Sequence, residues 1–485
     1  MVLAYFFGAS TVSDAYFVAQ TIPEFLFSLA VQAVAIGFIP IYMEILHNDG
    51  CKRAMRFTNN LLGFGLLLVV VLVGAVYGFT GGIVRMFASG FTSSAAQMAE
   101  TFVRISVWGM FFRIVSAIYT ALLNANDRFA VTALTGIPLD LITISSVLLA
   151  YYLDSPELLA LGIAVGYLGQ LLVQYPAVRR LKPRVCWKEI SFADPYLKKM
   201  IALFLPVVFG VGANQVNILV DRTMASSIEG GISALNYANK VGNILENIIV
   251  LSLATVIFPT LSKHAAQKQT DRLSMDIGKS LMIVLLTMLP CAVFVFQYAQ
   301  EIIQLLFARG VFDARAATLT ADAMRFYSIG LLFISFNAIL TRALYSLKKV
   351  KMTSIATCCA MLTNAVLNLT FAPVMGVRGL ALATSIANIL QTVVLGAALC
   401  RQIGKWYLYI VSKDALKCAV CVICMGGVSL VLSNLLKNFL PWLTATILAA
   451  SISIVVYIGM LILLKVQLIF EGIASIKHMH GLHKT

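Results

Sequence analysis

Long apolar stretches separated by short polar segments dominate this sequence. A helix that crosses a bilayer needs about 20 apolar residues, and the pattern predicts thirteen spans of that kind. Continuous apolar runs such as 61–76 argue against a membrane β-barrel, whose strands alternate apolar and polar residues. The predicted spans are 15–45, 57–79, 97–123, 129–153, 158–178, 200–226, 232–260, 279–298, 320–345, 352–373, 379–400, 415–436 and 441–464.

Composition and charge agree with a multi-pass membrane protein. Of the 485 residues, 60% are hydrophobic and 12% are charged, against roughly 45–50% and 25% in soluble domains. The net charge of +15 is uneven, because one alternating set of loops holds 25 Lys and Arg residues and the other set holds 5. Loops rich in these residues stay in the cytoplasm, so the tail with Lys477 is predicted to be cytoplasmic. The net positive charge therefore lies mainly in the loops that are predicted to be cytoplasmic. No motif predicts a nucleic-acid partner.

Two pairs of similar segments indicate an internal duplication. Arg104 aligns with Arg325 at an offset of 221, and Pro40 aligns with Pro259 at an offset of 219. Transporters are often built from such parallel repeats. The segments are 86–109 with 306–330, and 15–45 with 232–260.

The duplication predicts an all-α polytopic membrane protein with two pseudo-symmetric six-helix lobes plus two C-terminal helices, fourteen helices in all. It also predicts that the first helix is truncated, because the partner of span 200–226 would begin before Met1. The predicted parts are an N-lobe at 1–178, a basic cytoplasmic linker at 179–199, a C-lobe at 200–400, an extra helix pair at 401–464 and a cytoplasmic tail at 465–485.

Polar stripes occur on two of the spans that the duplication superposes. Polar residues inside a membrane usually face protein or a water-filled cavity. The stripes predict a hydrated cavity between the lobes, and the alternative is an interhelical hydrogen-bond seam. The charges favour the cavity. The first stripe is Gln20, Glu24 and Ser28, continued by Gln32, and the second is Asn236, Asn239, Lys240, Asn243 and Glu246, continued by Asn247.

Other intramembrane polar residues allow structural interpretations. Asp322 and Arg325 lie three residues apart, and Glu100 and Arg104 lie four apart, so each is predicted to form a local ion pair. No metalloprotease or nucleotide-binding motif occurs, so we expect neither an enzyme nor a resident cofactor. Any transport would then run on an ion gradient or on the membrane potential.

Four stretches carry a family resemblance: YFFGASTVSDAYFVAQTIP (5–23), VDRTMASSIEGGISALNYANKV (220–241), LLFARGVFDARAATLTADAMRFYSIGL (305–331) and GVRGLALATSIAN (376–388). Together they resemble the MurJ (MviN) lipid II flippases of the multidrug/oligosaccharidyl-lipid/polysaccharide exporter superfamily. The resemblance implies a central cationic cavity and outward movement of an undecaprenyl-pyrophosphate-linked glycan, the peptidoglycan precursor, across the bacterial inner membrane. It also implies contact with membrane lipids, since the last two helices form a groove for the polyprenyl tail.

The resemblance assigns roles to particular residues. Lys240 stands at an arginine position of the family, whereas Phe27 and Ser28 stand where many members carry arginine. Lys240 is therefore the predicted pyrophosphate contact, with the two stripes as the substrate-binding set. Some family members have a sodium site, so the resemblance implies Na+ or H+ as the coupling ion. The matching positions for a monovalent cation are Asp221, Asn364, Asn368, Leu380 through its carbonyl, and Thr384.

Two other classes of function stay open at this point. One is a flippase or exporter for another polyprenyl-linked glycan, or a cation-coupled antiporter of the same superfamily. The other is a membrane scaffold that transports nothing. Exposure of the lipid-linked precursor on the outer surface of cells discriminates among them.

Overall fold

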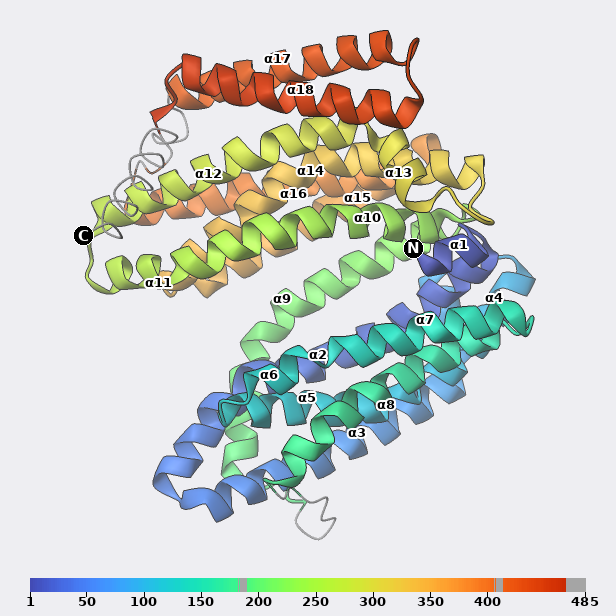
Figure 1. The fold of residues 1–485 in the computed structure, drawn as a ribbon. Coiled ribbons are helices and arrows are strands. Elements are labelled where there is room, and N and C mark those ends of the chain that lie inside the picture. The colour runs from blue at the N-terminus through green and yellow to red at the C-terminus, as the bar shows by residue number, and fades with distance from the viewer. Residues whose placement is uncertain (182, 184–189, 405, 407–412, 468–485) are drawn as a thin grey trace. The chain divides into compact units, whose positions relative to one another are not determined.

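The computed structural model describes residues 1–181, 183, 190–404, 406 and 413–467, and this part of the chain is helical without a strand (Figure 1). Its contacts form two compact units. Unit 1 is Met1–Ser233 with Arg309–Asp313, and unit 2 is Ala234–Ala308 with Ala314–Thr485. The all-α prediction is therefore confirmed for the described residues.

The helices of unit 1 are α1 (Val2–Phe7), α2 (Thr11–Asn48), α3 (Gly50–Phe87), α4 (Ser93–Ser106), α5 (Gly109–Ala125), α6 (Phe129–Ala133), α7 (Gly136–Tyr152), α8 (Glu157–Arg179) and α9 (Pro195–Ala225). A helix that begins in unit 1 and continues into unit 2 is α10 (Gly231–Glu246). Unit 2 continues with a π-helical turn (Asn247–Leu251), α11 (Ser252–Ala266), α12 (Thr270–Gln297), α13 (Ala299–Phe307), α14 (Ala314–Ser346), α15 (Val350–Met375), α16 (Val377–Ile403), α17 (Lys413–Leu436) and α18 (Trp442–Leu463).

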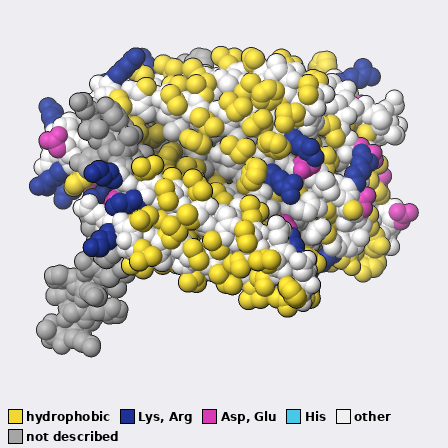
Figure 2. Space-filling model, turned by 90° about the horizontal axis from the view of Figure 1, so that it is seen from above, with side chains coloured by type: hydrophobic (Ala, Val, Ile, Leu, Met, Phe, Trp, Pro, Cys, Tyr) yellow, Lys and Arg dark blue, Asp and Glu magenta, His cyan; other side chains and the backbone are white. Residues whose placement is uncertain are grey.

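The predicted spans fall within these helices. Ten helical segments of the described chain are long and apolar enough to cross a membrane, and α4 with α5, bent by 45°, makes an eleventh. The remaining two predicted spans correspond to α9 and to α10 with α11, which the π-helical turn divides. Apolar side chains cover much of the face in Figure 2. Large exposed ones such as Val71, Ile423 and Leu463 are suited to contact lipid tails.

Unit 1 is organised around α2, which packs against α3, α4, α5 and α9. The Phe38 ring is stacked with those of Tyr42 and Phe57, with centroids 5.3 and 5.8 Å apart. All three side chains are buried. Since lipid tails are as apolar as these rings, it is close packing that holds such helices together inside a bilayer.

A buried carboxylate fixes the start of α2 to the turn between α9 and α10. Asp14 accepts hydrogen bonds from the backbone N–H groups of Gly230 (2.9 Å) and Ser233 (2.7 Å), and from the Ser233 hydroxyl. These N–H groups lie at the start of α10, where a helix has no internal acceptors for them. Gly230 has a φ of +74° and a Cβ added there would clash with the Ala9 carbonyl oxygen, so a side chain at this position would be strained. Asp14 therefore acts as an N-cap supplied by another helix.

Unit 2 has its core between α12, α14 and α16, where Leu281, Ile339 and Leu395 are buried. The α17–α18 pair packs on α12 through polar contacts as well as apolar ones. Tyr457 of α18 donates a hydrogen bond to the Leu286 carbonyl at 2.8 Å, and Tyr298, at the end of α12, contacts the Ser429 hydroxyl at 2.5 Å. Two tyrosines thus fix the position of the extra helix pair.

One packing contact supports the predicted duplication. A Cβ added at Gly109 would lie 2.8 Å from the Ala164 α-carbon, and one added at Gly330 would lie 2.9 Å from the Ser385 α-carbon. The two glycines are 221 residues apart, and so are their two partners. Equivalent close helix approaches, α5 on α8 and α14 on α16, therefore occur in both halves of the chain.

The predicted domain limits stay predictions. The contacts of α9 with α2 and α3 assign this helix to unit 1, whereas the duplication predicts that it opens the C-lobe. Residues 182 and 184–189 of the linker and nearly all of the tail, with Lys477, lie outside the described residues.

The two predicted local ion pairs have different outcomes. The Asp322–Arg325 pair is confirmed at 3.6 Å, although Arg378 of α16 makes a shorter contact with Asp322, at 2.6 Å. The Glu100–Arg104 pair is wrong for the described structure, because no ion pair joins them and Arg104 donates to the Thr80 hydroxyl instead. Proximity along a helix permits an ion pair, and the neighbouring helix decides whether it forms.

Candidate functional site

A charged cluster lies along α2 in unit 1. The Glu24 carboxylate lies 3.5 Å from the Arg113 guanidinium of α5 and accepts a 3.3 Å hydrogen bond from the Tyr167 hydroxyl of α8. Arg113 also donates to that hydroxyl at 2.9 Å, and its guanidinium lies 5.1 Å from the centroid of the Tyr167 ring. Three helices therefore meet at one acid, one base and one phenol.

This cluster is open enough to exchange partners. The Glu24 side chain is 42% exposed and the Arg113 side chain is 23% exposed, whereas Tyr167 is buried. A partly exposed ion pair contributes roughly 1 kcal/mol or less. Tyr167 holds the guanidinium by stacking and hydrogen bonding, while Glu24 provides a loosely held counter-charge. An incoming anion can replace Glu24 at little cost.

The rest of the α2 stripe is partly accessible. Gln20 and Ser28 are both half-buried, and Ser28 donates a hydrogen bond to the Phe25 carbonyl. Phe27 is buried, so it packs in the core. Gln20, Glu24 and Ser28 therefore share the partly exposed side of α2, as the stripe predicts.

Sequence reasoning missed Arg113 as a site residue. Its partner Glu24 lies 89 residues earlier, and α5 carries no polar stripe that would mark it. One signal was present. Placing a lone arginine in an apolar span costs so much free energy that such an arginine is a functional candidate.

The second stripe lies on α10. Asn239, Lys240 and Asn243 are exposed, and Asn236 and Glu246 are half-buried. Within the described residues no ion pair engages Lys240. About three turns of α10 therefore present one ammonium group among amide groups, a surface suited to a hydrated anion.

The stripe on α10 ends at the π-helical turn Asn247–Leu251. Such turns are rare and often occur at functional sites. Here the turn divides a polar helix from the more apolar α11, which contains Pro259. It marks the end of the candidate binding surface along this span.

Four of the five predicted cation ligands come together between α15 and α16. Asn368 donates to the Asn364 side-chain oxygen at 2.7 Å, Asn364 donates to the Thr384 hydroxyl at 3.0 Å, and Thr384 donates to the Leu380 carbonyl at 3.1 Å. Three oxygens of this chain, those of Asn364, Thr384 and the Leu380 carbonyl, already accept hydrogen bonds, and none of the four groups is charged. Asp221, the one acid of the set, is half-buried on α9 in unit 1. In unit 2 alone these residues fit a helix-packing seam better than a cation site.

The shared cavity stays a prediction. Gln20, Glu24 and Ser28 belong to unit 1, and the stripe from Asn236 to Glu246 belongs to unit 2. Each unit separately exposes the stripe that the sequence predicts for it.

Curated relatives are similar to this chain along most of their length. A probable lipid II flippase MurJ of Buchnera aphidicola subsp. Baizongia pistaciae is 28% identical over 451 residues, which cover 91% of this chain and 86% of the relative. A probable lipid II flippase MurJ of Vibrio cholerae is 28% identical over 500 residues, covering 96% and 92%.

Solved structures show the same fold. A lipid II flippase MurJ in an inward closed conformation has a TM-score of 0.79 at 24% identity, covering 95% of this chain and 94% of that chain. An inward-facing multidrug resistance transporter of the MATE family has a TM-score of 0.71 at 14% identity, covering 83% and 95%. The family model described as "Lipid II flippase MurJ" matches residues 3–453. The resemblance seen in the motifs is confirmed, and the chain belongs to the lipid II flippase MurJ family.

Proposed function

We propose that this multi-pass membrane protein is a lipid II flippase, which moves a lipid-linked peptidoglycan precursor outward across the bacterial inner membrane. The observation that carries the proposal is the family match over residues 3–453, together with a fold shared along nearly the whole chain. Its activity is transport, not enzymatic catalysis. An antiporter or a flippase for another glycan has less support, since the curated relatives are named for lipid II.

The physical problem of this function is the pyrophosphate. Bare phosphate charge in hydrocarbon is prohibitively costly, so the headgroup needs a hydrated path with cationic partners. Lys240 of unit 2 and Arg113 of unit 1 are both exposed in part and both lie on or beside a predicted stripe. We propose Lys240 as a pyrophosphate contact of unit 2 and Arg113 as a candidate pyrophosphate contact of unit 1. The amides Gln20, Asn236, Asn239 and Asn243, with Ser28 and Glu246, supply polar lining.

Movement would follow alternating access, in which one lobe rocks against the other around a fixed site. The polyprenyl tail can remain in the bilayer, so only the headgroup requires a polar path. As coupling ion we propose Na+ or H+. Asp221 is the proposed charged ligand for such an ion.

Lys240→Gln should lower exposure of the precursor at least tenfold, because a hydrogen bond to a charged group contributes about 1.5–3 kcal/mol. Lys240→Arg should retain activity, since guanidinium pairs bidentately with phosphate. The measurement is extracellular precursor in cells depleted of their own flippase, with expression checked by immunoblot. Lys351→Gln removes an exposed charge away from the stripe and serves as the control. Full activity of Lys240→Gln would exclude an essential role for this charge.

Arg113→Gln should also lower exposure about tenfold, whereas Tyr167→Phe, which keeps the charge, should cost much less. Glu24→Gln releases the guanidinium and should leave at least wild-type activity in the same assay. The Glu24 variant distinguishes a substrate-binding role of Arg113 from a structural role of the ion pair. If it fails as completely as Arg113→Gln while protein levels stay normal, the ion pair is structural and the assignment of Arg113 is rejected.

The coupling ion is tested by changing one gradient at a time in the exposure assay. Replacing external Na+ by choline at constant pH should slow flipping if Na+ drives it. Collapsing the pH gradient at constant Na+ should slow flipping if H+ does. An unchanged rate under both treatments would exclude coupling to either ion.

The orientation can be tested within unit 1. Cys51 is exposed just beyond the last turn of α2, and Ser227 is exposed in the α9–α10 turn that Asp14 ties to the first turn of α2. The two positions thus lie at opposite ends of α2. The loop charges predict a cytoplasmic Cys51. In a Cys186→Ser background, an impermeant maleimide should label Ser227→Cys in intact cells and Cys51 only after permeabilisation, and the reverse pattern would invert the topology.

A further inference from the structure

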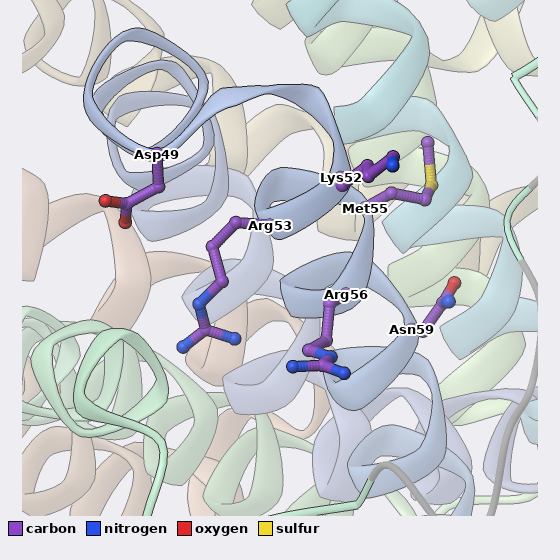
Figure 3. Close-up of a pocket in the computed structure, with 6 residues that line it drawn as sticks. All are labelled: Asp49, Lys52, Arg53, Met55, Arg56 and Asn59. Carbon is purple, nitrogen blue, oxygen red and sulfur yellow. The ribbon is translucent and has the colours of Figure 1, made fainter.

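A pocket of about 530 Å³ lies at the turn between α2 and α3, outside the two stripes. It is lined by Asp49, Lys52, Arg53, Met55, Arg56 and Asn59 (Figure 3). Its lining holds three basic groups, one acid and an apolar methionine. Its volume falls in the range of small-molecule sites.

One wall of this pocket is fixed by the first turn of α9. Arg53 forms a 3.0 Å ion pair with Asp194, and its guanidinium lies 5.5 Å from the centroid of the Tyr196 ring. Tyr196 donates a 2.6 Å hydrogen bond to Asp49. That hydrogen bond raises the pKa of the Tyr196 phenol. The acid of the lining is thereby already engaged.

The other basic groups of the pocket have no such partner. Lys52 and Arg56 are exposed, and within the described residues neither forms an ion pair. Figure 3 shows the side chains of Arg53 and Arg56 extending the same way from successive turns of α3. Within the described part of the chain, the pocket therefore holds two basic groups that form no ion pair, beside a third that Asp194 orients.

α3 is kinked at Phe79, and its predicted apolar span begins at residue 57. Lys52 and Arg56 precede this span, so the pocket lies at the level of the lipid headgroups, just outside the hydrocarbon core. The loop charges assign this end to the cytoplasmic side, where anionic lipids attract basic groups.

We propose that this pocket binds the headgroup of an anionic phospholipid of the cytoplasmic leaflet, with its phosphodiester at Arg56 and with Lys52 supplying a second positive charge at the rim. A guanidinium and an ammonium match a phosphate in charge and in donor geometry. The pocket is larger than one phosphate, which leaves room for the glycerol of the headgroup, and Met55 offers an apolar contact toward the acyl chains. The site lies apart from the residues proposed for transport, so the proposal of a lipid site does not depend on lipid II flipping.

The test uses the full-length protein in zwitterionic detergent, with bimane on the native Cys51 in a Cys186→Ser background. Titration with dioctanoyl phosphatidylglycerol should change the fluorescence saturably, and dioctanoyl phosphatidylcholine should not. Lys52→Gln with Arg56→Gln should weaken phosphatidylglycerol binding about thirtyfold, which corresponds to about 1 kcal/mol for each charge near the surface.

Two further variants make the result specific. Lys349→Gln with Lys351→Gln removes the same charge at the exposed α14–α15 turn and should leave binding unchanged. Lys52→Arg with Arg56→Lys keeps the charge and should bind as the wild type does, which controls for misfolding. Equal binding of both lipids, or equal weakening in both double glutamine variants, overturns the proposal. Displacement by 10 mM inorganic phosphate identifies a site for soluble anions and overturns the lipid assignment.

Discussion

The absence of water from the hydrocarbon core is the constraint on which this structure depends. A polar group inside a bilayer must find its partner in the chain or face a hydrated space. The chain meets this requirement by gathering its buried polar groups into a few clusters that join different helices. These clusters are Asp14 with Gly230 and Ser233, Asn364 with Asn368 and Thr384, Asp322 with Arg378, and Gln174 with Ser116 and Thr120.

The same constraint explains which parts of the fold were predictable. Each span must be apolar over about 20 residues, so all the spans could be read from hydropathy alone. The duplication was predictable because close helix packing conserves small residues at fixed positions, as at Gly109 and Gly330. The break in the span that holds α10 and α11 was not predictable, since a π-helical turn leaves no mark in hydropathy.

The candidate site was predictable only where one helix carries the signal. The stripe around Lys240 shows a helical period and was found. Arg113 and Asp14 acquire their roles from distant segments, and no local spacing reveals those partners. The Asp322 carboxylate shows both cases, because its contact with Arg325 follows from spacing and its shorter contact with Arg378 requires the fold.

The ion pair between Glu24 and Arg113 also has an electrical consequence. Moving one elementary charge across the whole membrane changes its electrical free energy by about 2.3 kcal/mol for each 100 mV of membrane potential. An arginine paired with a glutamate carries no net charge, so the resting cluster of unit 1 can move without electrical work. Lys240, which no ion pair engages in the described chain, is a net charge on the opposite unit. Any voltage dependence of the unloaded protein that arises from these two sites would therefore come from Lys240.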